Sequence, residues 1–140
     1  MEKPAPVPSK ASAFYWEHAR KGELVIQGFE GTDFVQFPPN DRAERFDIDS
    51  EAVPVRVSGN GTIYSFSVLH QAFHPAFAED LPLVLALVEL DDHPGIRILT
   101  NILEAKPEEV SIGMPVEVVF EDRGEYTLPQ FRPTQQEVAA

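Results

Sequence analysis

His70 and His74 are the two side chains in this sequence whose type and spacing come nearest to a metal site. A His-x3-His pair binds a metal ion when both imidazoles lie on one face of a helix. Here His70 ends a strand-like run and His74 stands in a loop before Pro75, which makes a metal site the least favoured interpretation. Two others stay open: the segment lines a groove for a ligand or partner, or it is plain loop packing.

Paired carboxylates are the other groups that could do chemistry, as general acids and bases. The pairs Asp91–Asp92, Glu108–Glu109 and Glu121–Asp122 all stand at expected turns or strand ends. With His93, the first pair could hold a weakly bound cation, although a solvated hairpin tip is the favoured interpretation. The serine-nucleophile, phosphate-loop and dinucleotide-binding motifs are missing from the sequence. We therefore predict no catalytic residue.

Two phenylalanines stand close together in the loop after His70, in the segment Phe73-His74-Pro75-Ala76-Phe77. Clustered aromatic side chains on a surface loop usually mark a contact. We predict that His70, Phe73, His74 and Phe77 contact a ligand or a partner. The alternative is that both rings cap one end of the barrel expected from the strands on either side.

Composition narrows the class of protein. The 140 residues contain no cysteine, which excludes disulfides and thiolate metal ligands and fits a cytoplasmic protein. The Pro-rich start is no signal peptide, and the apolar run 81–88 is too short to span a membrane. The net charge is −12, and residues 59–140 carry 13 acidic and 4 basic residues, a net −9. Such a surface repels nucleic acid.

The N-terminal region reads as a flexible arm, residues 1–11, followed by a short helix that ends near Gly22. Phe14, Tyr15 and Trp16 fan over roughly 200° of that helix, too wide for one buried stripe. At least one ring must therefore face something beyond the helix's own docking site. Either it packs elsewhere on this chain, or it anchors a partner protein.

The rest of the chain reads as strands. The segments 24–27 and 34–37 form a small hairpin around Gly28–Gly31, and a charged loop follows to about residue 52. From Val53 the chain reads mainly as strands, and the segment 62–71 alternates, with Tyr64, Phe66, Val68 and His70 expected on one face. The run 83–88 is apolar on both faces, as in a strand covered on both sides. Five strands with a short helix before the last pair predict an OB-fold barrel over residues 53–133, with a tail over 134–140.

A series of short motifs, in order and at matching spacing, resembles the acyl-CoA-associated OB-fold family that begins with a rubredoxin-like zinc ribbon. The resemblance covers about Phe14 to Pro133. The motifs that carry it are Phe14-Tyr15-Trp16-Glu17, the segment 22–28, Val35-Gln36-Phe37-Pro38-Pro39, the segments 58–66, 69–77 and 81–91, Leu99-Thr100-Asn101, the segment 112–116, and Val119-Phe120-Glu121-Asp122.

In that family two CxxC pairs flank the Phe-Pro-Pro stretch and bind zinc. The matching positions here are Gly28, Gly31, Ala43 and Phe46, so no zinc ligand carries over and we expect no metal. The resemblance therefore implies a mainly β fold: an N-terminal helix, a degenerate metal-free ribbon within residues 12–52, and the barrel. We hypothesise that an apolar plug of four phenylalanines replaces the metal: Phe29, Phe34, Phe37 and Phe46.

Members of that family look like non-catalytic accessory proteins that bind thiolase-like and acyl-condensing enzymes. The resemblance implies an accessory protein, not an enzyme, that docks on such a partner and helps to bind acyl-CoA in a shared site. We expect Phe14, Tyr15 and Trp16 to contribute to that contact. Bases are too sparse for tight CoA binding by this chain alone. The alternatives are a single-stranded nucleic-acid-binding module, which the acidic barrel disfavours, and a free-standing acyl-CoA enzyme, which no residue constellation supports.

Overall fold

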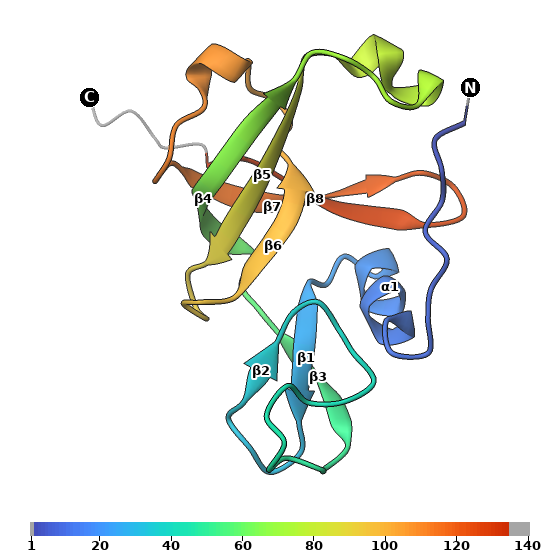
Figure 1. Ribbon diagram of the computed structural model, residues 1–140, viewed down its shortest axis with the longest axis vertical. Coiled ribbons are helices and arrows are strands. Elements are labelled where there is room, and N and C mark those ends of the chain that lie inside the picture. Colours follow the sequence, from blue (N-terminus) through green and yellow to red (C-terminus); the bar gives the residue numbers. More distant parts are fainter. Residues whose placement is uncertain (1, 135–140) are drawn as a thin grey trace.

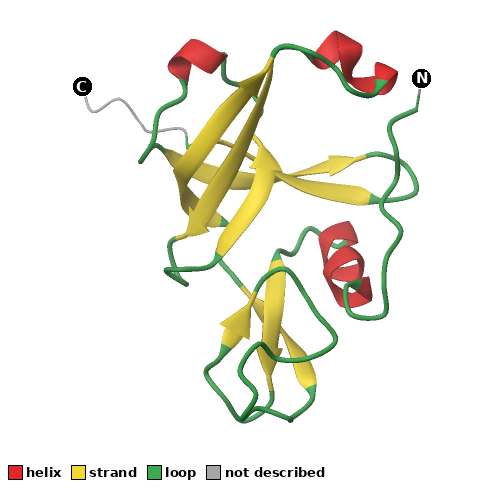
Figure 2. Cartoon of the chain, viewed as in Figure 1, coloured by secondary structure: helices red, strands yellow, loops and turns green. Residues whose placement is uncertain are grey.

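A computed structural model describes residues 2–134 and divides them between two antiparallel sheets and a short N-terminal helix (Figures 1 and 2). The smaller sheet has the strand order β2-β1-β3 and the larger one β6-β5-β4-β7-β8. This architecture confirms the predicted mainly β fold with an N-terminal helix and an OB-type barrel. No helix in residues 2–134 is long and apolar enough to cross a membrane.

The helix α1 (Ala13–Arg20) is fixed at both ends by local hydrogen bonds. At its start, the backbone N–H of Ser9 donates to Ser12 Oγ at 2.9 Å, and the Ser12 N–H donates to Ser9 Oγ at 3.1 Å. At its end Gly22 adopts φ +76°, a left-handed conformation that stops a helix and favours glycine. The predicted helix and its glycine stop are therefore confirmed.

The smaller sheet contains β1 (Val25–Phe29), β2 (Val35–Gln36) and β3 (Ala52–Arg56). The predicted hairpin is present as β1–β2, and the structure shows that Gln27 lies opposite Gln36 in it. The strand β3 was expected among the barrel strands, but it pairs along its whole length with β1. An alternating strand pattern identifies a strand and not its partner, which explains this difference. The boundary at residue 53 stays a prediction.

The larger sheet curls into a nearly closed barrel of β4 (Asn60–Leu69), β5 (Leu83–Leu90), β6 (Arg97–Asn101), β7 (Pro115–Asp122) and β8 (Thr127–Pro133). Two 3₁₀ helices interrupt it: η1 (Pro75–Asp80) and η2 (Pro107–Glu109). A parallel bridge between Ile102 and Phe131 joins the two edge strands. There the Leu103 N–H donates to the Phe131 carbonyl at 2.8 Å.

A β-bulge at Tyr64 corrects the predicted face of β4. Ile63 pairs with Val88, and the next paired residue is Ser65, opposite Leu87, so Tyr64 is the extra residue. The bulge turns Tyr64 outward, where it is 47% exposed, while Ile63 and Phe66 both contact the core. Strict alternation had placed Tyr64 and Phe66 together on one face. The guanidinium of Arg97 lies 3.7 Å from the Tyr64 ring centre.

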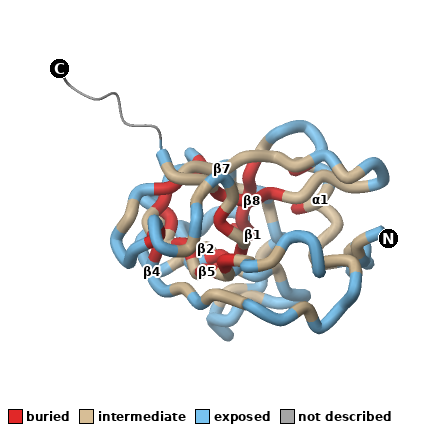
Figure 3. Tube along the Cα trace, turned by 90° about the horizontal axis from the view of Figure 1, so that it is seen from above, coloured by how far each residue is buried: buried red, intermediate tan, exposed pale blue. Residues whose placement is uncertain are grey.

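One apolar core runs through both sheets and the helix (Figure 3). It joins Tyr15 of α1 and Ile26 of β1 to Ile63, Val88 and Phe131 of the barrel. Phe131 and Val88 have no solvent exposure at all. The helix and the small sheet are therefore packed against the barrel as parts of one folded unit.

Candidate functional site

Of the three aromatic residues of α1, Tyr15 is buried and Trp16 is half-buried. Tyr15 is 9% exposed; its ring centre lies 5.1 Å from that of Trp16 and 5.7 Å from that of Phe37. Burial raises the pKa of the Tyr15 hydroxyl far above its usual range. Trp16 meets Tyr126 of the β7–β8 turn edge-on at 6.3 Å. These two rings hold α1 against the small sheet and the barrel hairpin.

Phe14 points to a different place. It is half-buried and lines a groove of about 580 Å³ together with Lys10, Asn40 and the first residues of β3, Ala52–Pro54. Trp16 lines a second groove, of about 610 Å³, on the side of the helix that meets Tyr126. The helix therefore presents Phe14 and Trp16 to two separate grooves, and not one aromatic patch.

The loop between β4 and β5 carries the other predicted contact residues. His74 caps η1: its Nδ1 accepts a hydrogen bond from the Ala76 N–H at 3.0 Å. The Phe77 ring lies edge-on to His74 at 6.1 Å and is half-buried. Phe73 is 85% exposed, and His70 is exposed as well. The structure therefore joins His74 and Phe77 and leaves Phe73 projecting from the surface.

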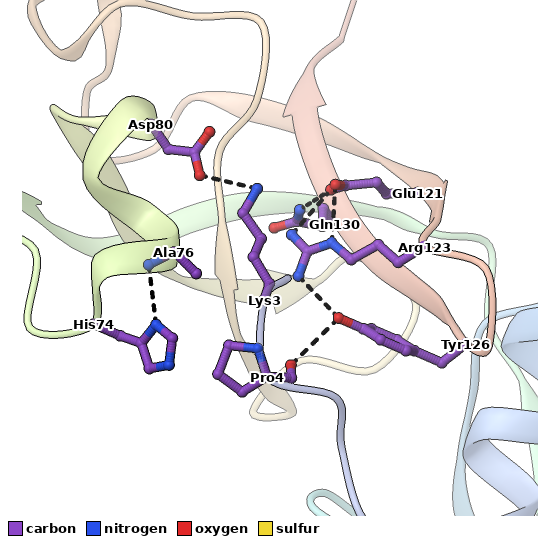
Figure 4. A network of polar contacts seen from close by, with 9 residues as sticks. All are labelled: Lys3, Pro4, His74, Ala76, Asp80, Glu121, Arg123, Tyr126 and Gln130. Carbon is purple, nitrogen blue, oxygen red and sulfur yellow. Dashed lines mark hydrogen bonds and ion pairs between the residues drawn. The ribbon is translucent and has the colours of Figure 1, made fainter. Parts of the chain in front are cut away.

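The segment expected to be a flexible arm lies across a cleft between η1 and the β7–β8 turn (Figure 4). The Lys3 ammonium is 2.9 Å from Asp80 and 5.7 Å from the centre of the Phe77 ring. The Tyr126 hydroxyl donates a hydrogen bond to the Pro4 carbonyl at 3.3 Å. Neither Lys3 nor Tyr126 was singled out from the sequence, because their spacing of more than 100 residues leaves no local signal.

Beside Lys3 lies a polar network at one end of the barrel, which also lines a cavity of about 240 Å³. Arg123 donates to Glu121 at 2.9 Å, and the Gln130 amide donates to the same carboxylate. Burial alone would raise the pKa of Glu121, but the hydrogen bonds from Arg123 and Gln130 outweigh it and hold that pKa below its ordinary value. Gln130 is 2% exposed and its Oε1 has no partner in the described residues.

Two buried glutamines organise the part of the chain that resembles a zinc ribbon. Gln27 and Gln36, each 2% exposed, face each other on β1 and β2, and Gln36 Nε2 donates to Gln27 Oε1 at 2.8 Å. The Gln27 amide also donates to the Asn40 carbonyl and accepts from the Asn40 N–H, at 2.8 and 2.9 Å. Gln36 donates to the Arg42 carbonyl at 2.9 Å and accepts from the Glu44 N–H at 2.8 Å. The pair therefore fixes the loop 40–44 through side-chain amides.

The four positions that match zinc ligands do not fit a metal ion. A Cβ added at Gly28 would lie 2.5 Å from Val55 Cγ2, so β3 fills the space that a thiol would need. Gly31 adopts φ +75°, Ala43 is half-buried, and Phe46 is fully exposed. Within residues 2–134, no group of three His, Asp or Glu side chains is placed to hold a metal ion.

The predicted phenylalanine plug is only partly correct. Phe29 and Phe34 stack at 6.2 Å, and the Arg45 guanidinium lies 5.7 Å from the Phe34 ring centre. Phe37 instead packs on Tyr15 of the helix, and Phe46 contributes nothing because it is exposed. The sequence interpretation counted apolar residues and missed that the loop is held by buried amides.

The expected hairpin tip at Asp91–Gly95 is a turn, and one of its carboxylates already has a structural partner. Asp92 accepts a hydrogen bond from the Ser58 N–H at 2.9 Å, which ties the β5–β6 turn to the segment before β4. Glu121 is paired with Arg123. Asp92 therefore anchors a turn, and Glu121 is held by Arg123 in the wall of the cavity of about 240 Å³.

The sequence and the fold of this chain are similar to those of known proteins. Residues 54–121 match the family model of the ChsH2 C-terminal OB-fold domain. A solved chain described as "Ltp2-ChsH2(DUF35) aldolase" superposes with a TM-score of 0.82 at 35% sequence identity, over 92% of this chain and 98% of that one.

Among curated proteins, a "Probable enoyl-CoA hydratase alpha subunit" of Thermomonospora curvata is 38% identical over 94% of this chain. The "3-oxo-4,17-pregnadiene-20-carboxyl-CoA hydratase alpha subunit" of Mycobacterium tuberculosis is 33% identical over 91%. This chain spans only 40% and 39% of the length of these two relatives.

A shorter relative is matched over most of its own length. The "DUF35 domain-containing scaffold protein" of Methanocaldococcus jannaschii is 38% identical over 106 residues, which cover 75% of this chain and 73% of that protein. These matches confirm the family resemblance seen in the motifs. The chain belongs to the DUF35 family of scaffold proteins, in a form without the cysteines of a zinc ribbon.

Proposed function

We propose that this protein is a non-catalytic accessory scaffold of acyl-CoA metabolism that docks on a thiolase-like enzyme. The observation that carries the proposal is the likeness, over nearly its whole length, to the DUF35 chain of a solved two-component aldolase. An enzyme would need a nucleophile with a base, or a metal centre. In the described residues, the carboxylates Asp92 and Glu121 instead accept structural hydrogen bonds, and no group of side chains is placed to hold a metal ion. The chemistry is therefore assigned to the partner.

The class of substrate follows from the relatives. Two of them are described as subunits of hydratases that act on CoA thioesters, and this chain matches a part of each. Because that part is about two fifths of their length, the hydratase activity is not assigned to this chain. We assign to this protein and its partner only the class of substrate, which is an acyl-CoA made or broken down in lipid, polyketide or steroid metabolism.

A shared acyl-CoA site fits the charge distribution better than a site on this chain alone. CoA phosphates need cations or a helix N-terminus, whereas the barrel arginines Arg97, Arg123 and Arg132 are already paired with Glu89, Glu121 and Glu104. The partner would therefore bind the phosphates, and this chain would line the apolar part of the ligand. The cytoplasmic location expected from the cysteine-free composition stays a prediction.

The proposed contact surface is the loop between β4 and β5. Phe73 is exposed, while Phe77 and His74 brace each other and η1, which gives Phe73 a firm base. His70 lies at the start of the same loop. We assign Phe14 to a second, smaller contact in its groove, and Tyr15 and Trp16 to holding the helix that carries it.

The proposal is tested by binding and turnover together. Each thiolase-superfamily enzyme of the source organism is purified and measured for affinity to this protein, and the protein alone is assayed on a panel of acyl-CoA thioesters. We expect one enzyme to bind, no turnover by the protein alone, and an affinity loss on the order of tenfold for Phe73→Ala. The matched control is Val7→Ala, which removes another fully exposed apolar side chain. Turnover by the pure protein would overturn the proposal.

A further inference from the structure

The outer face of β5 carries a row of half-buried leucines. Along this strand Val84, Ala86, Val88 and Leu90 are buried, so Leu83, Leu85 and Leu87 point outward. The strand pairing places Leu69 of β4 opposite Leu83, and Leu99 of β6 opposite Leu87. Together these five side chains form the leucine face: Leu69, Leu83, Leu85, Leu87 and Leu99.

The leucine face departs from the usual pattern of a barrel. An antiparallel sheet with one face in water normally carries polar side chains there. Here Leu99 of β6 is 63% exposed. On the other side of β5, Ser65 and Ser67 of β4 are too small to cover Leu87 and Leu85, the leucines opposite them. In Figure 1 the strands β4, β5 and β6 run side by side, with no helix of the described chain lying across them. The chain itself covers this apolar face only in part, because Leu83, Leu85 and Leu87 are half-buried and Leu99 is exposed, and a further molecule can bury the rest.

Charge decides which kind of molecule this is. Each copy of the chain carries a net charge of −12, so two copies brought face to face repel each other. A different protein, with an apolar patch and basic residues around it, meets no such penalty. The leucine face is also continuous with the proposed contact loop, because Leu69 is the last residue before that loop and Leu83 opens the strand after it.

We propose that the leucine face is the apolar centre of the interface with the thiolase-like partner, and that the Phe73 loop forms one edge of it. The opposite edge is polar: there Arg97 lies over Tyr64 and pairs with Glu89 at 3.4 Å. This arrangement of an apolar centre and a polar rim is the usual anatomy of a protein interface. The inference rests on the proposed function and assigns it a surface.

The test uses the purified full chain and the same panel of thiolase-superfamily enzymes. Leu99→Lys places a charge on the most exposed side chain of the leucine face, and Leu99→Thr keeps a side chain suited to a strand while removing most of that side chain's apolar surface. The matched control is Ile112→Lys, because Ile112 is 71% exposed in the turn before β7, away from the leucine face. Thermal unfolding verifies that all three variants are folded.

We expect Leu99→Lys to weaken binding on the order of tenfold or more, Leu99→Thr to weaken it less, and Ile112→Lys to change it less than twofold. Radical footprinting of the complex should protect the Leu87 and Leu99 side chains. Unchanged affinity for Leu99→Lys would overturn the assignment of this face and leave the proposed function standing. Failure of the wild-type protein to bind any enzyme of the panel would overturn both. A wild-type dimer by light scattering that Leu99→Lys dissolves would assign the face to a second copy and overturn the inference.

Discussion

The three-stranded sheet and the barrel are held together by opposite means. Inside the barrel most buried side chains are apolar, with Phe131, Val88 and Ile63 at or below 1% exposure and Thr100 and Gln130 as polar exceptions. Inside the small sheet the two residues that face each other at its centre are glutamines, and they make five hydrogen bonds with each other and with the loop 40–44. A ribbon without metal can therefore be organised by buried side-chain amides that hydrogen-bond to each other and to the neighbouring loop.

The two kinds of core should fail differently. Apolar packing tolerates small rearrangements, because dispersion and burial depend on area and not on direction. A buried amide network depends on every partner, since one lost partner leaves others unsatisfied. The following predictions separate the two regions, beginning with the largest effect.

Truncation of the barrel core should cost the most. Phe131→Ala removes a ring with no solvent exposure at the seam where β6 and β8 meet. We expect a loss of about 3–5 kcal/mol in the free energy of unfolding, measured by urea denaturation. The control is Ile112→Ala at an exposed site, which should stay within about 0.5 kcal/mol. A loss below about 1 kcal/mol for Phe131→Ala would show that the barrel does not depend on this seam.

Removal of one buried amide group should destabilise the small sheet and the loop 40–44, although the substitution is small. Gln36→Leu keeps the volume but leaves the Glu44 N–H and the Arg42 carbonyl without their partner, at a cost of about 1–3 kcal/mol. Hydrogen exchange at Glu44 should accelerate while barrel amides stay protected. Gln71→Leu, at an exposed glutamine, is the matched control. Unchanged exchange at Glu44 would contradict the role of the amides.

Restoring a thiol should not restore a metal site. Gly28→Cys brings a side chain against Val55 and should destabilise the protein by about 1–3 kcal/mol. Val55→Ala in the same chain should recover part of that loss. The melting temperature of the wild type should not change with a chelator or with zinc. Zinc at a stoichiometric level in the purified wild type would contradict the metal-free account.

The smallest effect concerns pH and the barrel-end network. The pKa of Glu121 is lowered in the folded state, so the unfolded chain binds this proton more readily. The stabilisation is therefore complete above the ordinary pKa near 4.5 and is lost as the pH falls through the lower folded value. Glu121→Gln should flatten this part of the stability curve, measured by thermal unfolding from pH 6 to 3. The same acid slope in the variant would show that Glu121 does not contribute.

The barrel was predictable because apolar segments and turn residues follow one another regularly along its sequence. Alternation marks β4, a continuous apolar run marks β5, and Gly and Pro mark the turns between strands. The pairing of β3 with β1 was not predictable from the pattern, because both sheets accept the same alternation. The bulge at Tyr64 was missed for a related reason, since one inserted residue leaves the composition of the strand unchanged.

The site was only partly predictable. Exposure of Phe73 follows from clustered aromatic residues in a loop, but burial of Tyr15 depends on Phe37 and Trp16, which only the fold brings to it. Gln27 and Gln36 look like ordinary surface residues until β1 and β2 pair. Their one sequence signal is that each polar residue is flanked by strongly apolar neighbours, Ile26 for one and Val35 and Phe37 for the other.

The central claim is that this scaffold works on a catalytic partner and has no turnover of its own. The most direct measurement is co-expression with each thiolase-superfamily enzyme of the source organism, followed by size exclusion with light scattering and an acyl-CoA turnover assay of the separate and combined proteins. We predict one stoichiometric complex, with activity only where the enzyme is present. Acyl-CoA turnover by this chain alone, or its elution apart from every such enzyme, would contradict the account.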